Sequence, residues 1–477
     1  MNINLLNNKI EDLKDSIIAV TLFEGETVSN NLKELSDEFE GKYNEIENIK
    51  AFIDGKFINV CLVGLGVKEK LDSEKLRVVG GNLAKKARLI IKKSKAEIKD
   101  LDIFNLKLEK EETQALIEGI ILGNYKFDKY KTEKEKEIHN VNINTEIDFT
   151  KEIEKAELLA KSTIIARNLV NEPSNIIYPE TLANEVVSLG EEYGFDVEIY
   201  EEDKIKDLQM NAFLAVASGS TNKPRFIVMR YLGDKENKEI LGLVGKGLTY
   251  DSGGYSIKPN SSMLDMKTDM GGAASVIGAM CAISCSKLNK NVVAVIAACE
   301  NSISGNAYKP GDIITSMSKK TIEILNTDAE GRLTLADAIY YVINNEKVTK
   351  VVDIATLTGA AVVALGSIAT PIVTNDNEFF DILENASKLS GEKIWKMPVF
   401  DEYKKIIKGS EADLRNSGSR EGGCITAGLF VGEFVNDIPW IHMDIAGTSV
   451  SSKSDGYKEK GATGEGVRTL FYLAQNI

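Results

Sequence analysis

Two carboxylates and a guanidinium stand at every second position of the stretch NTDAEGRL, residues 326–333. Asp328, Glu330 and Arg332 are separated there only by an alanine and by Gly331. In an extended backbone, residues two apart point to the same side, so we expect the two carboxylates to converge. They would repel each other unless one were protonated or a cation lay between them. The stretch therefore offers candidate ligands for a cation, and the flexible Gly331 lets the backbone approach the point where they converge.

Arg332 also begins a predicted helix, at the end where the helix dipole is positive. A cation is unfavourable there unless an anion lies close by, so Arg332 indicates an anion beside the cation site. The alternative for this stretch taken alone is a solvated acidic turn with an internal salt bridge.

Two glycine-framed segments supply further residues of the same kind. VGKGLTYDSGGYSIKP, residues 244–259, places Lys246, Asp251 and Lys258 at the end of an apolar strand, and TDMGGAA places Asp269 at the start of a small-residue helix. In open α/β sheets, ligands bind at the carboxyl ends of the strands. Together with the first stretch, these carboxylates predict a site for two divalent cations. The alternatives are a helix N-cap for Asp269 and surface positions for both lysines.

The chain contains two histidines, His139 and His442, and no HExxH sequence. A histidine-rich zinc site is therefore excluded, and any metal centre must be bound mainly through oxygen. Such ligands suit Mg or Mn, with Zn tolerated. His442 lies within a strand pattern and is expected to be a packed core residue rather than the base of a serine nucleophile.

The elements that must hold these residues alternate between strand and helix, which is typical of an α/β protein with a mostly parallel sheet. Residues 1–150 are expected to form a smaller N-terminal α/β domain, and residues 151–170 a connecting helix. Residues 171–477 are expected to form a larger C-terminal α/β domain that carries the predicted site, with a mixed, mostly parallel central sheet flanked by helices.

Apolar runs and helical periodicity place the elements within these domains. A helix over residues 29–42 would have Ser29 as its N-cap. The charged segment 126–148 is expected to be exposed connecting structure between the domains. The other predicted elements are strands at residues 16–25, 57–66, 239–245, 291–300, 321–325, 350–357 and 440–447, and helices at residues 73–90, 271–284 and 332–345.

The formal net charge of -14 disfavours nucleic acid or a membrane as a partner, because nucleic acids and anionic membranes are polyanions. The start of the chain lacks the pattern of a signal peptide, and no apolar run is long enough for a membrane span. The five cysteines are expected to be free thiols, so a cytoplasmic location is predicted. Lysines interleaved with acidic residues are expected to form a solvated helical face: Lys126, Lys129, Lys131, Lys134 and Lys136.

The segments that carry the predicted site resemble the signature sequences of the leucyl aminopeptidase family, the two-metal enzymes of the cytosolic leucine aminopeptidase type. The resemblance spans the chain from about residue 166 to the C-terminus, and GIILGNYKFDKYK, residues 119–131, extends it less specifically into the first domain. This chain departs from the family pattern at Tyr250, where Phe is common, and at Tyr255, where Ile or Val is usual. The matching segments are NTDAEGRL, VGKGLTYDSGG, SIKP, TDMGGAA, ARNLVNEPSN, CENSISGNAYKPGD, ATLTGA and HMDIAG.

The resemblance implies a role for each residue of the predicted site. One metal would be held by Asp251, Asp328 and Glu330, and the other by Lys246, Asp251, Asp269 and Glu330. Asp251 and Glu330 would then bridge the two ions, and Lys246 would have to bind as a neutral amine.

The resemblance also implies how the substrate would be held. Lys258 would polarise the scissile carbonyl, and Arg332 would hold a bicarbonate-like anion that relays a proton. The residues implied to line the side-chain pocket, for which ordinary packing is the alternative, are Met266, Thr356, Gly359 and Ala446.

The implied activity is hydrolysis of the N-terminal residue, Leu-like residues preferred, from peptides with a free N-terminus, by a hydroxide activated by two metals. The implied ions are Mn, Zn or Mg, and the implied assembly is a homohexamer. The rival hypotheses are a DNA-binding or regulatory scaffold with incidental peptidase activity, a non-hydrolytic metal-binding scaffold, and a Cys-Gly dipeptidase.

Overall fold

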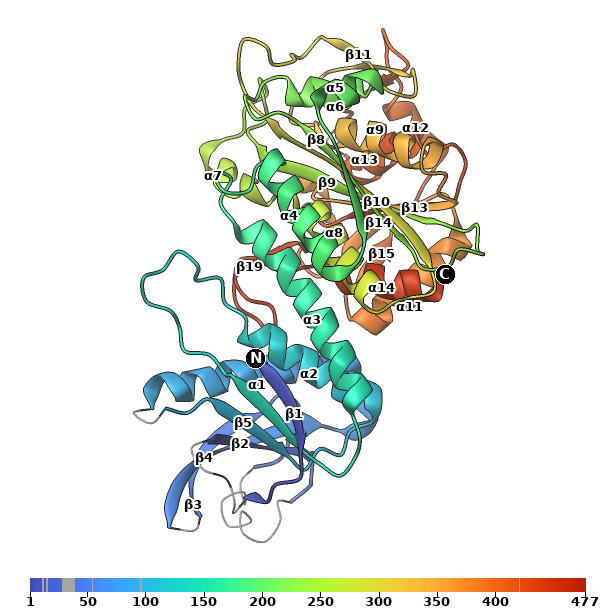
Figure 1. Ribbon diagram of the computed structural model, residues 1–477. Coiled ribbons are helices and arrows are strands. Elements are labelled where there is room, and N and C mark those ends of the chain that lie inside the picture. Colours follow the sequence, from blue (N-terminus) through green and yellow to red (C-terminus); the bar gives the residue numbers. More distant parts are fainter. Residues whose placement is uncertain (11–12, 14–15, 28–38, 54, 95–96, 420) are drawn as a thin grey trace. The chain divides into compact units, whose positions relative to one another are not determined.

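The computed structural model describes the chain except residues 11–12, 14–15, 28–38, 54, 95–96 and 420 (Figure 1). It contains two compact units, one of Met1–Lys161 with Ser452–Lys460 and one of Ser162–Ser451 with Gly461–Ile477. Both units are built from strands and helices, which confirms the predicted α/β fold class. Most of the helix predicted over residues 29–42, including Ser29, lies outside the described residues.

A six-stranded sheet forms the first unit, in the order β1-β6-β5-β2-β4-β3. In the described residues its neighbouring strands run parallel, except that β3 is antiparallel to β4. Helices α1 and α2 pack against each other beside the sheet (Figure 1). The elements are β1 (Asn2–Leu6), β2 (Ser16–Phe23), β3 (Ile46–Ile53), β4 (Lys56–Gly66), η3 (Lys68–Lys70), α1 (Ser73–Lys93), β5 (Asp100–Phe104), α2 (Lys110–Asn124) and β6 (Asn140–Asn144).

The prediction that residues 126–148 are exposed connecting structure is wrong for part of that segment. Asn140–Asn144 form β6, which pairs with β1 on one side and β5 on the other. Val141 and Ile143 are fully buried, while Asn140 and Asn142, which alternate with them, form side-chain hydrogen bonds to Asp100 of β5 and Asn4 of β1. The predicted helical face of lysines is also wrong, because residues 126–136 form loops and turns, although most of their lysines are exposed as predicted.

An eight-stranded mixed sheet forms the core of the second unit, in the order β15-β14-β17-β13-β9-β10-β8-β7. Its central strands β10, β9, β13 and β17 are parallel, and antiparallel pairs lie towards both edges. The prediction of a mixed, mostly parallel sheet is therefore confirmed. These strands are β7 (Asp196–Tyr200), β8 (Arg225–Leu232), β9 (Leu241–Asp251), β10 (Asn291–Asn301), β13 (Lys350–Ala355), β14 (Thr370–Thr374), β15 (Ile394–Lys396) and β17 (Trp440–Asp444). Smaller strands are β11 (Ile313–Thr315), β12 (Thr321–Glu323), β16 (Leu414–Arg415), β18 (Val450–Ser451) and β19 (Gly461–Ala462).

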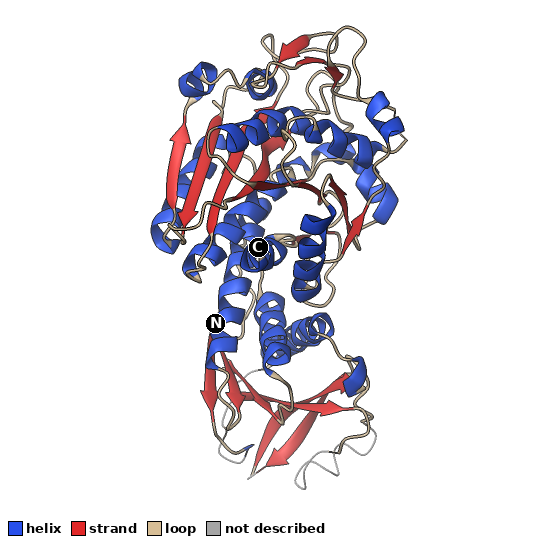
Figure 2. Ribbon diagram, turned by 90° about the vertical axis from the view of Figure 1, so that its right-hand side faces the viewer, coloured by secondary structure: helices blue, strands red, loops and turns tan. Residues whose placement is uncertain are grey.

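Helices cover both faces of this sheet, with α4, α8, α11 and α14 on one face and α6, α9 and α13 on the other (Figure 1 and Figure 2). The helix expected after the charged segment is present as α3 (Thr150–Asn171). The remaining helices are α4 (Pro179–Tyr193), α5 (Glu202–Asp207), α6 (Asn211–Ala217), α7 (Asn260–Met263), η4 (Met266–Thr268), α8 (Gly271–Cys285), α9 (Gly331–Asn344), α10 (Gly359–Leu365), α11 (Asn377–Ser390), α12 (Asp401–Ile406), α13 (Gly423–Gly432) and α14 (Val467–Asn476).

Helix α8 lies very close to the centre of the sheet. A Cβ atom added at Gly272 would lie 2.0 Å from the carbonyl oxygen of Ile354 in β13. Within the described residues, one stretch, Met266–Cys285, is long and apolar enough to cross a membrane, but 89% of its most apolar window is buried in the unit. This stretch is therefore a core helix, and its close packing fixes the loop before it against the strand ends.

Candidate active site

The predicted site residues come from two sheets: Lys246 and Asp251 lie on the central strand β9, whereas Asp328 and Glu330 follow β12 of a separate three-stranded sheet. Lys246 lies within β9, Asp251 ends it, and Lys258 follows in the next loop. Asp328 and Glu330 do not lie on extended backbone, so the strand alternation that predicted their convergence is wrong. Asp328 lies in a turn after β12, and Glu330 is the N-cap of α9 in right-handed helical conformation (φ -82°, ψ -38°).

The carboxylates nevertheless converge. Asp251, Asp328 and Glu330 each offer one oxygen within 4.8 Å of the others. The ammonium of Lys258 lies 2.8 Å from Asp251 Oδ2 and 2.6 Å from Asp328 Oδ1. Three oxygens at this spacing can surround a divalent cation, which takes carboxylate ligands at about 2.0–2.6 Å.

Lys246 joins this cluster to a second group of ligands. Its Nζ lies 2.7 Å from Asp269 Oδ1 and 2.9 Å from Glu330 Oε1. It also donates to the carbonyl oxygen of Thr356, at 3.0 Å. The hydroxyl of Thr356 donates to Asp269 Oδ1 at 2.8 Å, so the loop after β13 is tied to the same group. The residues that the sequence placed on separate loops therefore meet in one buried cluster.

Three residues that the sequence did not single out hold the cluster together. The side-chain amide of Asn301 donates to Asp251 Oδ1 at 2.8 Å and to the carbonyl oxygen of Thr327 at 3.0 Å. The Tyr308 hydroxyl donates to the same Thr327 oxygen at 2.8 Å. Asn301 and Tyr308 lie in the segment CENSISGNAYKPGD, whose match to the family was the available signal, but their types alone indicate no role.

Glycines allow these loops to approach the carboxylates. Gly253 has φ +85°, and a Cβ there would lie 2.8 Å from Asp328 Oδ1. A Cβ at Gly331 would lie 2.4 Å from Cε of Lys246. Gly331 therefore has the role predicted for it, since any larger residue would collide with a side chain of the cluster.

The electrostatics of the cluster follow from burial. Burial raises the pKa of Asp251 to about 6, and the nearby charge of Glu330 adds to the rise. Burial also raises the pKa of Asp269 to about 8. The same burial would lower the pKa of Lys246, but Asp269 and Glu330 outweigh it, and its pKa lies above the usual value. A divalent cation would relieve this crowding of negative charge.

Atoms without protein partners test whether the cluster fits metal ions and an anion. Among the described residues, Glu330 Oε2 is buried with no hydrogen-bond partner, as a ligand oxygen would be. The Nε atom of Arg332 is also buried and unpartnered, and burial lowers the pKa of this guanidinium to about 10. The oxygen donors therefore suit a hard divalent cation, and Arg332 suits an anion.

The predicted pocket residues come from three segments of the chain. Thr356 is bonded to it directly, and Met266 begins the short η4 helix that ends just before Asp269. Gly359 begins α10 and is exposed, with no atom within 4 Å of where its Cβ would lie. Ala446 follows β17 and is half-buried. Along the chain, Met266 lies three residues before Asp269 and Gly359 three residues after Thr356, whereas the backbone N–H of Ala446 donates to Asp444 Oδ1.

His442 is a core residue, as predicted. It is fully buried, and its Nδ1 lies 2.6 Å from Asp353 Oδ1, whose other oxygen accepts a hydrogen bond from Trp440 Nε1 at 2.7 Å. This network fixes the imidazole inside β17 and leaves it out of the cluster.

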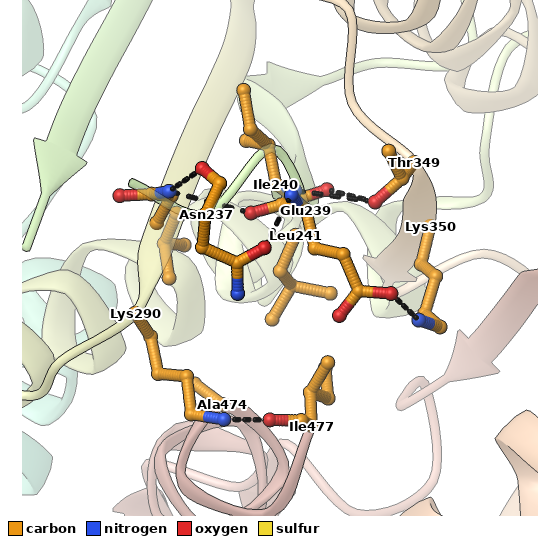
Figure 3. Close-up of a pocket in the computed structure, with 11 residues that line it drawn as sticks. Asn237, Glu239, Ile240, Leu241, Lys290, Thr349, Lys350, Ala474 and Ile477 are labelled. Carbon is orange, nitrogen blue, oxygen red and sulfur yellow. Dashed lines mark hydrogen bonds and ion pairs between the residues drawn. The ribbon is translucent and has the colours of Figure 1, made fainter. Parts of the chain in front are cut away.

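Two hollows in this unit contain none of the predicted site residues. One is a crevice of about 20 Å³ beside Lys290, whose ammonium bonds the C-terminal Ile477 (Figure 3). It has room for about one water molecule and no converging carboxylates. The other, of about 750 Å³, opens beside Lys396 and Trp440. The carboxylate cluster therefore remains the candidate site, on the basis of its chemistry.

Comparison with known proteins matches both units to one family. A sequence profile described as "Cytosol aminopeptidase family, catalytic domain" matches residues 164–471, and one described as its N-terminal domain matches residues 23–134. A "Probable cytosol aminopeptidase" of Clostridium perfringens is 48% identical over 488 residues, covering 99% of each chain. Its counterpart in Aquifex aeolicus is 42% identical over 495 residues, covering 100% of this chain and 99% of that protein.

A solved structure has the same fold. "Bottromycin maturation enzyme BotP in complex with Mn" superposes with a TM-score of 0.87 at 29% identity, covering 97% of this chain and 99% of that one.

Proposed function

The chain belongs to the cytosol aminopeptidase family and is a metal-dependent aminopeptidase, a hydrolase of the amino termini of peptides, and we propose that the cluster around Glu330 is its active site. The family resemblance predicted from the signature segments is thereby confirmed. The observation that carries the proposed site is the convergence of Asp251, Asp328 and Glu330 within 4.8 Å, beside the buried group of Lys246 and Asp269.

We propose that these five residues hold two divalent cations. Asp251, Asp328 and Glu330 would hold one, and Lys246, Asp251, Asp269 and Glu330 the other. When bound, two such ions lower the pKa of water towards neutrality and so supply a hydroxide nucleophile. Lys246 would lose its ammonium proton in order to bind a metal ion. The carboxylates stabilise its positive charge, and two nearby cations would disfavour that charge.

The chain's own cations would act on the peptide bond. Lys258 stands 15% exposed at the edge of the cluster, so its ammonium can donate a hydrogen bond to the scissile carbonyl oxygen. Such a donor stabilises the negative charge that develops on that oxygen by about 3–4 kcal/mol. Arg332 would hold a bicarbonate-like anion, which can carry a proton to the leaving amine.

We also propose the metal ions, the substrate pocket, the assembly, the location and the domain division of the protein. Mn or Zn, and also Mg, suit its oxygen-rich ligands, and a relative's structure contains Mn. We propose a pocket of Met266, Thr356, Gly359 and Ala446 that prefers Leu-like residues. We further propose a homohexamer, a cytoplasmic location, and the division into an N-terminal domain (1–150), connecting helix (151–170) and catalytic domain (171–477).

Metal removal tests the proposed site and reaction together. We expect chelated protein to lose bound metal and hydrolysis of Leu-p-nitroanilide in parallel, and Mn, Zn or Mg to restore both. N-acetyl-Leu-p-nitroanilide is the matched control, because its amine is blocked. Metal analysis and initial rates are the measurements. Full activity after complete metal removal, or equal cleavage of the acetylated substrate, would contradict the proposal.

The rival functions have no specific observation in their favour. The net charge of -14 opposes a DNA-binding role, and binding of duplex DNA that survives physiological salt would restore that rival. A Cys-Gly dipeptidase would cleave Cys-Gly much faster than Leu-p-nitroanilide, which a panel of substrates measures directly.

A further inference from the structure

Asp444 ends β17 directly beside the end of β13, and its side chain is almost completely buried. Its Oδ1 accepts backbone N–H groups of Leu357 at 3.1 Å, Thr358 at 3.3 Å and Ala446 at 3.2 Å. Its Oδ2 accepts the hydroxyl of Thr358 at 2.6 Å. One buried carboxylate therefore holds the loop after β13 and the turn after β17 together.

The same loop is fixed at its other end by the candidate active site. Thr356 donates its hydroxyl to Asp269 Oδ1 at 2.8 Å, and its carbonyl oxygen accepts from Lys246 Nζ at 3.0 Å. Residues 356–358 are thus held between two proposed metal ligands and Asp444. The next residue, Gly359, faces open space, with no atom within 4 Å of a Cβ position.

We propose that Asp444 is a positioning residue that sets the distance between the metal ligands and the pocket wall formed by residues 356–359 and Ala446. Its role would be to place the substrate's N-terminal side chain so that the scissile bond reaches the ligands correctly. A displacement of about 1 Å in such a loop can cost 10²-fold in rate. This inference rests on the proposed function and deepens it, because it assigns to Asp444 the control of selectivity for the substrate's N-terminal side chain.

A carboxylate matches the hydrogen-bond pattern at this position, because both of its oxygens accept. The Thr358 hydroxyl accepts the backbone N–H of Ala361 at 3.1 Å, where it caps α10, and donates its own proton to Asp444 Oδ2. An asparagine could accept the three backbone N–H groups through its oxygen, but its amide would present hydrogens to the hydroxyl. Asp444→Asn therefore keeps the shape and loosens the loop.

The test compares selectivity for two side chains. We expect Asp444→Asn to lower the ratio of kcat/KM for Leu-p-nitroanilide to that for Ala-p-nitroanilide at least fivefold, with bound metal unchanged. Thr358→Val, which removes the hydroxyl but keeps the shape, should shift the ratio in the same direction. Thr358→Ser, which keeps the hydroxyl, should stay within twofold of wild type. A loss of folded protein alone would lower both rates equally and leave the ratio unchanged.

Asp376→Asn is the matched control, because Asp376 caps α11 by accepting the backbone N–H of Phe379 at 2.8 Å, outside the proposed site. Its ratio should stay within twofold of wild type. If Asp444→Asn does not fold, the pair at Thr358 decides. A ratio within twofold of wild type in the metal-replete variants overturns this inference alone, whereas metal-loaded wild type that cleaves neither substrate overturns the proposed function and the inference with it.

Discussion

Lys246 and Glu330 face each other inside the catalytic unit, with Nζ of Lys246 2.9 Å from Oε1 of Glu330 and both side chains 3% exposed. Burying a charged pair is favourable only when the remaining polar atoms also find partners. Lys246 meets that condition through Asp269 and Thr356, but Oε2 of Glu330 does not, among the described residues. A bound cation would therefore supply the partner that Oε2 of Glu330 lacks in this buried pair.

Replacing Glu330 tests that conclusion. Glu330→Gln keeps the size of the side chain but removes the charge that would bridge two cations. Outer-shell partners of metal sites typically contribute 10–100-fold to metal affinity, so we expect this ligand to contribute more than about 100-fold. Titration with Mn followed by metal analysis measures the loss, and hydrolysis of Leu-p-nitroanilide should disappear with it.

Glu323→Gln is the control for this variant, because Glu323 lies in β12, a few residues earlier. Its carboxylate accepts backbone N–H groups of Ser410 and Glu411, at 3.0 and 3.1 Å, and does not face the cluster. It should bind metal as wild type does. Normal metal content in Glu330→Gln would remove Glu330 from the ligand set.

The sequence could predict which residues meet here, but not the way in which they meet. Residue types and glycine framing identified Asp251, Asp328 and Glu330, because carboxylates that lie close together repel one another unless a proton or a cation compensates their charge. The turn after β12 depends instead on contacts from elsewhere, such as the Asn416 side chain, which accepts from Leu325 N at 2.9 Å and donates to Asn326 O at 2.6 Å. Such distant partners have no local signal.

The N-terminal unit also contains an element, β6, that the sequence did not predict. β6 is five residues long, and the charged residues before it hid its two apolar positions, Val141 and Ile143. Its place between β1 and β5 is set by pairing with strands far away in the chain. Asp444 was likewise invisible, because a single Asp in HMDIAG indicates nothing until four donors are seen to surround it.

Lys258 should act on the reaction and leave metal binding intact. Lys258→Met removes the ammonium that lies at the edge of the cluster, and the loss of one donor to a developing oxyanion costs about 10²–10³ in kcat. We expect a loss of this size for Leu-p-nitroanilide, with metal content unchanged. Lys320→Met is the control, since Lys320 pairs with Glu433 at 2.9 Å outside the proposed site. Wild-type kcat in Lys258→Met would exclude Lys258 from the chemistry.

Asp337 should make the stability of the protein depend on pH. It is fully buried in α9, where burial raises its pKa from 3.8 to about 7, although backbone N–H groups of Met317 and Phe213 favour its charged form. The folded state thus holds a proton that the unfolded state has lost. The resulting stabilisation is fully present below about pH 4 and is lost as the pH rises through about 7.

Comparison with Asp337→Asn isolates this contribution, because all other titrating groups are shared. We expect the free energy of unfolding of wild type minus that of the variant to fall as the pH rises from 5 to 8, since only wild type loses the contribution of Asp337. Urea unfolding at several pH values measures the difference. A constant difference across this range would show that Asp337 carries the same charge in the folded and unfolded states.

Gly331 should not tolerate a side chain without disturbing the ligand set. A methyl group at this position would lie 2.4 Å from Cε and 2.8 Å from Nζ of Lys246, and Lys246 is held on three sides by Asp269, Glu330 and Thr356. Gly331→Ala must therefore push the lysine out of the ligand set or shift the start of α9. Because alanine favours helix by about 1 kcal/mol over glycine, the helix itself should remain. We expect at least tenfold weaker metal binding, measured by Mn titration, with a far-UV circular dichroism spectrum like that of wild type. Gly305→Ala is the control, because no atom lies within 4 Å of the new methyl group, and it should bind Mn normally. Equal Mn affinity in the two variants would show that metal binding does not depend on the present position of Lys246.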